Sequence, residues 1–177
     1  MALHRAAPNL AEHEGRHHFS APAERTGVMS HLETILLATD GSPASESASE
    51  EAIDLAVQVQ ARLLVVSVLG TSARPSEASA GAGSLADSRD SLTTKAQSIV
   101  QRAKASGADA TFLVWEGEPG EAIVAAAESE NADMIVVGSH GRSGVSRFLI
   151  GSVSDYVVRH AHCPVMVVRG RPDSTRR

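Results

Sequence analysis

The 177-residue sequence is long enough for one domain and an additional tail, and its hydrophobic content of 42% is sufficient for a single core. Aromatic residues make up only 3% of the chain, so aliphatic side chains must fill that core. The formal net charge of −5 argues against nucleic-acid binding by general electrostatic attraction. Cys163 is the only cysteine, and no apolar run reaches membrane-spanning length. We therefore expect a cytoplasmic protein that binds neither nucleic acid nor membranes.

The N-terminal segment, residues 1–31, shows neither helical nor strand periodicity and contains mainly His, Ala, Pro, Glu and Arg. Such a segment buries little apolar surface, so we expect a disordered extension. Met29 precedes the first apolar run, and one hypothesis is that the native chain starts there. At the other end, residues 170–177 are expected to form a basic tail. This division leaves residues 32–169 as the folded domain.

The first folded elements are a strand and a helix. Residues 34–39 are an apolar run too short for a helix, which predicts a buried strand. The run ends in Asp40, and Ser42 and Pro43 then suit the cap and the first position of a helix. Residues 63–69 form a second apolar run, typical of a central strand that is covered on both faces. The apolar face predicted for the intervening helix comprises Ala48, Ala52, Leu55, Ala56 and Val59.

A long connection follows the second strand. Residues 70–86 are rich in Gly, Ala and Ser and have no period, which is typical of a flexible segment. Connections of this length in a compact domain are often functional, for example as a lid over a ligand. A tolerated insertion explains the composition equally well, so both interpretations stay open.

The rest of the chain continues the alternation of helices and strands. A second helix ends at Gly107 and precedes a third strand at 111–115. A short Ala-rich helix at 121–130 leads to a fourth strand at 133–137, and the last strand covers 165–168. The apolar face of the second helix is predicted to comprise Leu92, Ala96, Ile99, Val100 and Ala103.

The fourth helix has a polar start. Ser152 and Asp155 stand at capping-box spacing, so we expect the helix to begin with Ser152 as its cap and to run to about Ala161.

Five strands that alternate with helices predict an α/β fold with an open parallel sheet and helices on both faces. In such sheets ligands bind beyond the carboxyl ends of the strands, where the strand order reverses. The two connections richest in polar and glycine residues are 39–43 and 138–152, after the first and fourth strands. They meet at one site if these two strands are neighbours.

The connection after the fourth strand has the composition of an anion-binding loop. Glycines let the backbone N–H groups approach a phosphate, and the following helix adds positive charge at its N-terminus. The spacing is not that of a P-loop, because no lysine occurs in this loop. It is not a dinucleotide fingerprint either, because the turn after the first strand reads ATDGSPAS. The glycines and the serine that define the spacing are Gly138, Gly141, Gly151 and Ser152.

This G-x2-G-x9-G-S spacing resembles that of the ATP-binding subgroup of the universal stress protein family, and the resemblance extends over about residues 32–169. It implies a Rossmann-like, single-domain, five-stranded sheet of order 3-2-1-4-5. It also implies a homodimer that pairs through the last strand, Val165, Met166, Val167 and Val168.

The resemblance further implies an ATP site. Asp40 would approach the ribose or a Mg²⁺ ion bound to the phosphates, and the backbone of Val68 would meet the adenine. The hydroxyl groups of Ser152 and Ser154 are expected to donate to the phosphates. The residues implied to contact ATP are Ala38, Thr39, Asp40, Val68, Gly138, Ser139, His140, Gly141, Arg142, Ser143, Gly151, Ser152, Val153 and Ser154.

Several side chains in or near this loop could either contact a ligand or serve the fold alone. Arg142 and Arg147 could neutralise phosphate charge or could be solvated, and His140 could contact the nucleotide or support the loop. A further cluster comprises His160, His162 and Cys163. These residues lie where the last helix runs into the last strand, so their side chains are expected to diverge and not to form a metal site.

The sequence contains no positioned general base and no Walker-type lysine, so efficient hydrolysis is not expected. We predict a nucleotide-dependent regulatory or binding module of the stress response that acts on a protein partner. The alternatives are a slow ATPase or phosphotransferase, and a protein–protein adaptor that binds no nucleotide.

Overall fold

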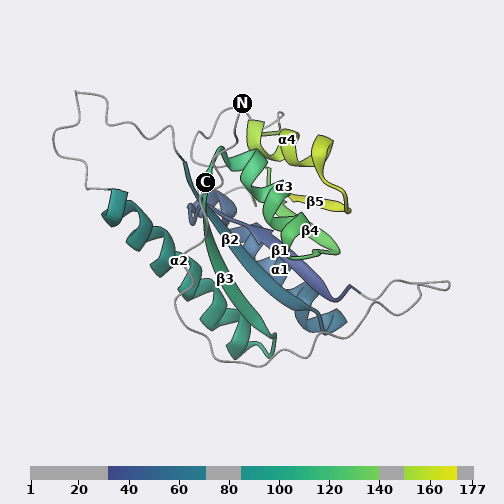
Figure 1. The fold of residues 1–177 in the computed structure, drawn as a ribbon. Helices are drawn as coiled ribbons and strands as arrows, with labels where there is room; N and C mark the ends of the chain where they lie inside the picture. The colour runs from purple at the N-terminus through teal and green to yellow at the C-terminus, as the bar shows by residue number, and fades with distance from the viewer. Residues whose placement is uncertain (1–31, 71–84, 140–149, 171–177) are drawn as a thin grey trace, which may run out of the picture. The chain divides into compact units, whose positions relative to one another are not determined.

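The structure, a computed structural model, describes residues 32–70, 85–139 and 150–170 (Figure 1). Within these residues one parallel sheet has the strand order β3-β2-β1-β4-β5. The α/β class and the order 3-2-1-4-5 are therefore confirmed. The strands are β1 (Thr34–Ala38), β2 (Arg62–Gly70), β3 (Ala110–Gly117), β4 (Met134–Gly138) and β5 (Val165–Val168).

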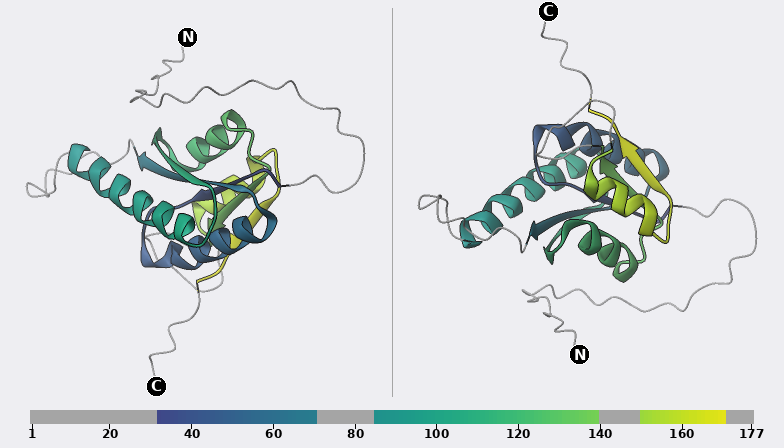
Figure 2. Two further views of the ribbon diagram at one scale, coloured as in Figure 1. Left: turned by 90° about the horizontal axis from the view of Figure 1, so that it is seen from below. Right: turned by 90° about the horizontal axis from the view of Figure 1, so that it is seen from above.

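The helices cover both faces of the sheet (Figures 1 and 2). Helices α1 (Glu46–Val59) and α2 (Leu85–Ala105) pack on one face, and α3 (Pro119–Ser129) and α4 (Ser152–His160) pack on the other. Alternate residues of a strand point to opposite faces. Ile35 and Leu37 of β1 accordingly lie in the apolar cluster beneath α1 and α2, whereas Leu36 lies in the cluster beneath α3 and α4. The sheet is thus buried on both sides.

Strand β1 is the centre of this arrangement. It pairs with β2 on one edge and with β4 on the other, so that Leu36 lies opposite both Leu64 and Ile135. All three side chains are almost completely buried. Because β1 and β4 are neighbours, the connections that follow them leave from the same edge of the sheet, which is the condition for a shared site.

Two helices begin differently from the prediction. A 3₁₀ turn, Pro43–Ser45, precedes α1, so Ser42 occupies the cap position of this turn and Ser45 that of α1. The Ser42 hydroxyl makes no capping hydrogen bond and has no partner among the described residues. The expectation that this hydroxyl caps the first helix is therefore wrong. Helix α3 begins at Pro119, two residues earlier than predicted, because proline is well suited to the first helical position.

The predicted apolar faces of the first two helices differ in accuracy. In α1 the alanines are buried, but Val59 is 37% exposed because the helix ends there and Gln60 turns into the left-handed region with φ of 58°. The whole predicted face of α2 is buried, namely Leu92, Ala96, Ile99, Val100 and Ala103.

Candidate functional site

A cavity of about 640 Å³ lies at the carboxyl edge of the sheet. Its floor is formed by the ends of β1, β2 and β4, and its walls by the first turns of α2, α3 and α4. At this edge the connection from β1 enters α1 on one face, while that from β4 leads toward α4 on the other. This is the switch point at which open α/β sheets bind ligands, and the volume is typical of a small-molecule site.

The residues predicted to contact ATP fall into three groups. Ser139 lies beside the cavity and acts through its backbone, as described below. His140, Gly141, Arg142 and Ser143, together with Arg147, lie outside the described residues. The other predicted residues line the cavity, namely Ala38, Thr39, Asp40, Val68, Gly138, Gly151, Ser152, Val153 and Ser154.

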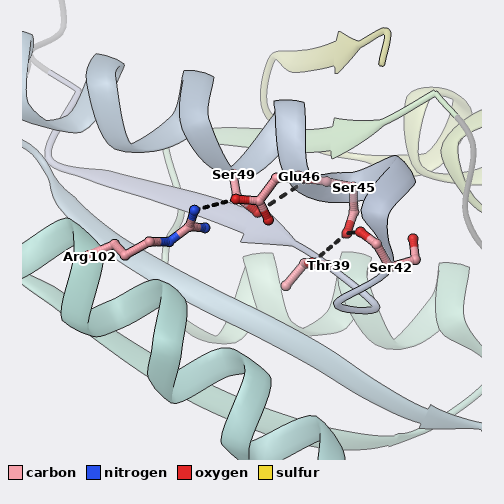
Figure 3. Close-up of polar contacts among 6 residues, drawn as sticks. All are labelled: Thr39, Ser42, Ser45, Glu46, Ser49 and Arg102. Carbon is pink, nitrogen blue, oxygen red and sulfur yellow. Dashed lines mark hydrogen bonds and ion pairs between the residues drawn. The ribbon is translucent and has the colours of Figure 1, made fainter. Parts of the chain in front are cut away.

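A chain of hydrogen bonds fixes the turn after β1 (Figure 3). The Ser45 hydroxyl donates to the Ser42 carbonyl at 2.8 Å, so its only proton is committed. Thr39 Oγ1, 3.0 Å from Ser45 Oγ, must therefore donate to Ser45, and it accepts the Gly41 N–H at 3.1 Å. Both hydroxyl protons are thus used within the protein. Thr39 lines the cavity, but its hydroxyl holds the turn and does not donate to a ligand.

The same turn holds a carboxylate at the cavity. Asp40 Oδ1 accepts the Ser42 N–H at 3.0 Å, and a carboxylate has about four acceptor positions in total. Gly41 adopts a φ of +64°, and a Cβ there would lie 2.4 Å from the Lys95 side chain of α2. Glycine is therefore favoured at this position by the backbone conformation, and a larger residue would also displace the Lys95 side chain. The turn that carries Asp40 thus lies close to α2.

Helix α4 is anchored to the end of β4 by backbone hydrogen bonds. The Gly151 N–H donates to the Ser139 carbonyl, and the Ser139 N–H donates to the Val168 carbonyl, each at 2.7 Å. Gly151 is the N-cap, with the Asp155 N–H bound to its carbonyl at 2.9 Å. The predicted capping box at Ser152 is therefore wrong by one residue. The Asp155 carboxylate instead pairs with Arg159, one turn along the helix.

The first turn of α4 presents backbone donors to the cavity. The N–H groups of Ser152, Val153 and Ser154 have no acceptor within the helix, because a helix leaves its first N–H groups unpaired. All three residues line the cavity. Unpaired N–H groups and the positive end of the helix dipole together favour an anion at this wall.

One of the predicted phosphate donors has another role. The Ser154 hydroxyl is buried and donates to the Gly138 carbonyl at 2.6 Å. Its single proton is committed to that bond, so it cannot also donate to a phosphate. The expectation for this side chain is wrong, because it ties α4 to β4. The Ser152 side chain is exposed.

One wall of the cavity was not predicted from the sequence. Asp87, Ser88 and Ser91 stand in the first two turns of α2 and line the cavity with Leu92. The available signal was topological, since a helix that follows a parallel strand begins at the carboxyl edge of the sheet. These residues were not identified because the sequence placed the start of the helix only approximately.

In the cluster near the last strand, His160 and Cys163 have partners or surroundings that are explained by the fold. The His160 ring stacks on Tyr156 with centroids 4.0 Å apart, and its Nδ1 lies 2.8 Å from the Tyr156 carbonyl oxygen. Burial raises the pKa of the Cys163 thiol, and the negative charge of Asp133 raises it further. A protonated, half-buried thiol is a poor nucleophile and a poor metal ligand. Over the described ranges, no group of three potential metal-ligating side chains comes together.

No helix in the described part of the chain combines the length and the apolar character needed to cross a membrane.

A sequence profile described as the universal stress protein family matches residues 31–169. The chain belongs to the universal stress protein family. A universal stress protein of Methanocaldococcus jannaschii is 34% identical over 139 residues, which cover 76% of this chain and 81% of that relative. The resemblance seen in the sequence is therefore confirmed at the level of the family.

Solved universal stress proteins share the fold. Universal stress protein UspA from Lactobacillus plantarum superimposes with a TM-score of 0.66 at 28% identity, over 80% of this chain and 100% of that one. A universal stress protein crystallised in complex with cAMP gives a TM-score of 0.62, also at 28% identity, over 80% of this chain and 100% of that one.

Proposed function

We propose that this universal stress protein binds ATP in the cavity at the carboxyl edge and acts in the cytoplasm as a nucleotide-dependent regulatory or binding module of the stress response. The observation that carries the proposal is the first turn of α4, where Ser152, Val153 and Ser154 line the same cavity as the ends of β1 and β2. The first turn of α4 offers unpaired N–H groups, whereas the end of β2 is apolar. This arrangement suits a ligand that is anionic at one end only.

The proposed pose follows the order of the strands. The phosphates lie at Gly151 and the first turn of α4, beside the end of β4. The ribose lies near Asp40 at the end of β1, and the base lies over Val68 at the end of β2. Neighbouring strands are about 4.8 Å apart, so β4 and β2 are separated by roughly 10 Å, a distance that a nucleotide spans. The Asp40 carboxylate, an oxygen ligand, also suits a Mg²⁺ ion that arrives with the phosphates.

The cavity is better suited to binding than to hydrolysis. Among the described residues that line it, no side chain is basic, and the ionisable ones are the carboxylates of Asp40 and Asp87. Phosphoryl transfer relies on cationic groups placed around the transferred phosphate. The loop arginines Arg142 and Arg147 would have to supply them in the alternative of a slow ATPase or phosphotransferase.

A universal stress protein solved in complex with cAMP supports the class of ligand, because this chain is 28% identical to it over 80% of its length. It also makes cAMP a ligand to compare with ATP.

Isothermal titration calorimetry of the full chain with ATP, AMP, cAMP and adenosine tests the proposal. We expect affinity to fall in the order ATP, AMP, adenosine, since each phosphate removed loses hydrogen bonds to α4. Equal affinities for ATP and adenosine would contradict the assignment of the phosphates. Binding of none of the four would favour the nucleotide-free adaptor, and steady phosphate release that Asp40→Ala abolishes would favour the enzyme.

We also propose a homodimer that forms through β5. This strand lies at the edge of the sheet, and its Met166 is 36% exposed. On the neighbouring helix α4, Val158 is 48% exposed. An exposed apolar edge strand is a template for pairing with another chain. Sedimentation equilibrium should give a dimer for the full chain and a monomer for Met166→Asp. A monomeric full chain would contradict this assembly.

A further inference from the structure

The polar wall of α2 has no role in the binding mode described so far. Asp87, Ser88 and Ser91 line the cavity from the face of the sheet opposite to α4. Helix α2 packs on β2 and β3, so its first turns stand beyond the end of β2 and away from β4. Asp87 therefore stands at the β2 end of the cavity, which is the end assigned to the base, and on the face opposite to α4.

The charges of the two walls, α4 and α2, determine the orientation of a ligand in the cavity. The first turn of α4 favours negative charge, whereas the Asp87 carboxylate repels it. A nucleotide with its phosphates on α4 and its base over Val68 must direct the far edge of the base toward α2. This inference rests on the proposed function, because it uses that orientation of the nucleotide.

The chemistry of this wall is selective. A carboxylate only accepts hydrogen bonds, so Asp87 pairs with an amino group and repels a carbonyl oxygen. The hydroxyl groups of Ser88 and Ser91 both donate and accept, so they adapt to either edge and carry less selectivity.

We propose that Asp87 selects the base: it accepts a hydrogen bond from the exocyclic amino group of adenine and discriminates against bases that carry a carbonyl oxygen at that position. Because a hydrogen bond to a charged group is strong, and because a carboxylate repels a carbonyl oxygen, the expected preference for adenine is roughly tenfold.

The test compares ATP with inosine triphosphate, which carries an oxygen where ATP carries the amino group. Calorimetry of the full chain should show ATP binding at least about tenfold more tightly than inosine triphosphate. Asp87→Asn can donate as well as accept, so it should bring the two affinities to within about threefold. The matched control is Asp90→Asn, an exposed carboxylate on the same helix that does not line the cavity. It should leave the ratio unchanged.

Each other outcome has a distinct meaning. If ATP binds but the ratio is the same in wild type and Asp87→Asn, the selection by Asp87 is overturned and the proposed function stands. If Asp87→Asn instead changes the ratio of ATP to 2′-deoxy-ATP, the carboxylate contacts the ribose, and base selection is likewise overturned. If neither triphosphate binds the wild-type protein, the proposed function itself fails.

Discussion

A Gly120→Ala variant is expected to be less stable than the wild type by about 1–3 kcal/mol, although the same change usually stabilises a helix by about 1 kcal/mol. Gly120 lies in the first turn of α3, where it meets α4. A Cβ on this residue would lie 2.7 Å from Cδ1, 2.8 Å from Cγ and 3.0 Å from Cβ of Tyr156. These atoms are the root of the Tyr156 side chain, so relief requires α4 to move.

Urea unfolding, followed by circular dichroism, measures this effect. The matched control is the same substitution in a Tyr156→Ala background, which removes the two shortest contacts and leaves only the 3.0 Å approach of the Cβ of residue 156. There Gly120→Ala should cost clearly less than in the wild type, so the double-mutant cycle should show coupling between the two positions. A Gly120→Ala variant that is more stable than wild type would show that α3 and α4 are not as closely packed as the structure indicates.

A Gly151→Val variant is expected to bind ATP at least about tenfold more weakly, a loss of about 1.4 kcal/mol in binding free energy. Gly151 is the N-cap of α4, with φ of −62° and ψ of 154°, a conformation that valine also adopts. The backbone should therefore keep its course. The branched side chain would crowd the unpaired N–H groups of the first turn, where a phosphate must approach to hydrogen-bonding distance.

Adenosine separates this local effect from a loss of structure. Its affinity should change by less than about threefold in Gly151→Val, because the proposed pose places the nucleoside over β1 and β2. The control substitution is Ile150→Val, one residue earlier at a side chain that is 48% exposed and does not line the cavity. It should leave both affinities unchanged. Unaltered ATP affinity in Gly151→Val, measured by calorimetry, would contradict the phosphate site.

The architecture was predictable because its signals are local. Each strand is a short apolar run, and the buried side chains of β1 and β2 show that such runs do lie under helices on both faces. The exact strand order, in contrast, came from the resemblance to a family. Nothing in the composition of β4 alone determines that it pairs with β1.

The hydrogen-bond partners of hydroxyl groups could not be predicted from the sequence. Thr39 and Ser154 stand at positions that suggest ligand contacts, yet each hydroxyl group donates its hydrogen bond to another group of the protein. The acceptor of Ser154 is the Gly138 carbonyl, 16 residues earlier in the chain. Whether a hydroxyl serves a ligand or the fold depends on such distant partners, which a spacing pattern does not contain.

The polar wall of α2 was missed for a different reason. Asp87, Ser88 and Ser91 are exposed polar residues with no periodic signal, so they resemble any solvated helix surface. Only the packing of α2 on β2 and β3, and the length of the helix, bring them to the cavity.

Amide chemical shifts offer the most direct test of the central claim, that the first turn of α4 holds the phosphates of ATP. In a titration of the isotope-labelled full chain with ATP, the amide signals of Ser152, Val153 and Ser154 should shift and saturate at the dissociation constant that calorimetry gives. Adenosine should shift mainly the signals of residues 68–70. If saturating ATP left the three α4 amides unchanged, the phosphates would not lie at this helix.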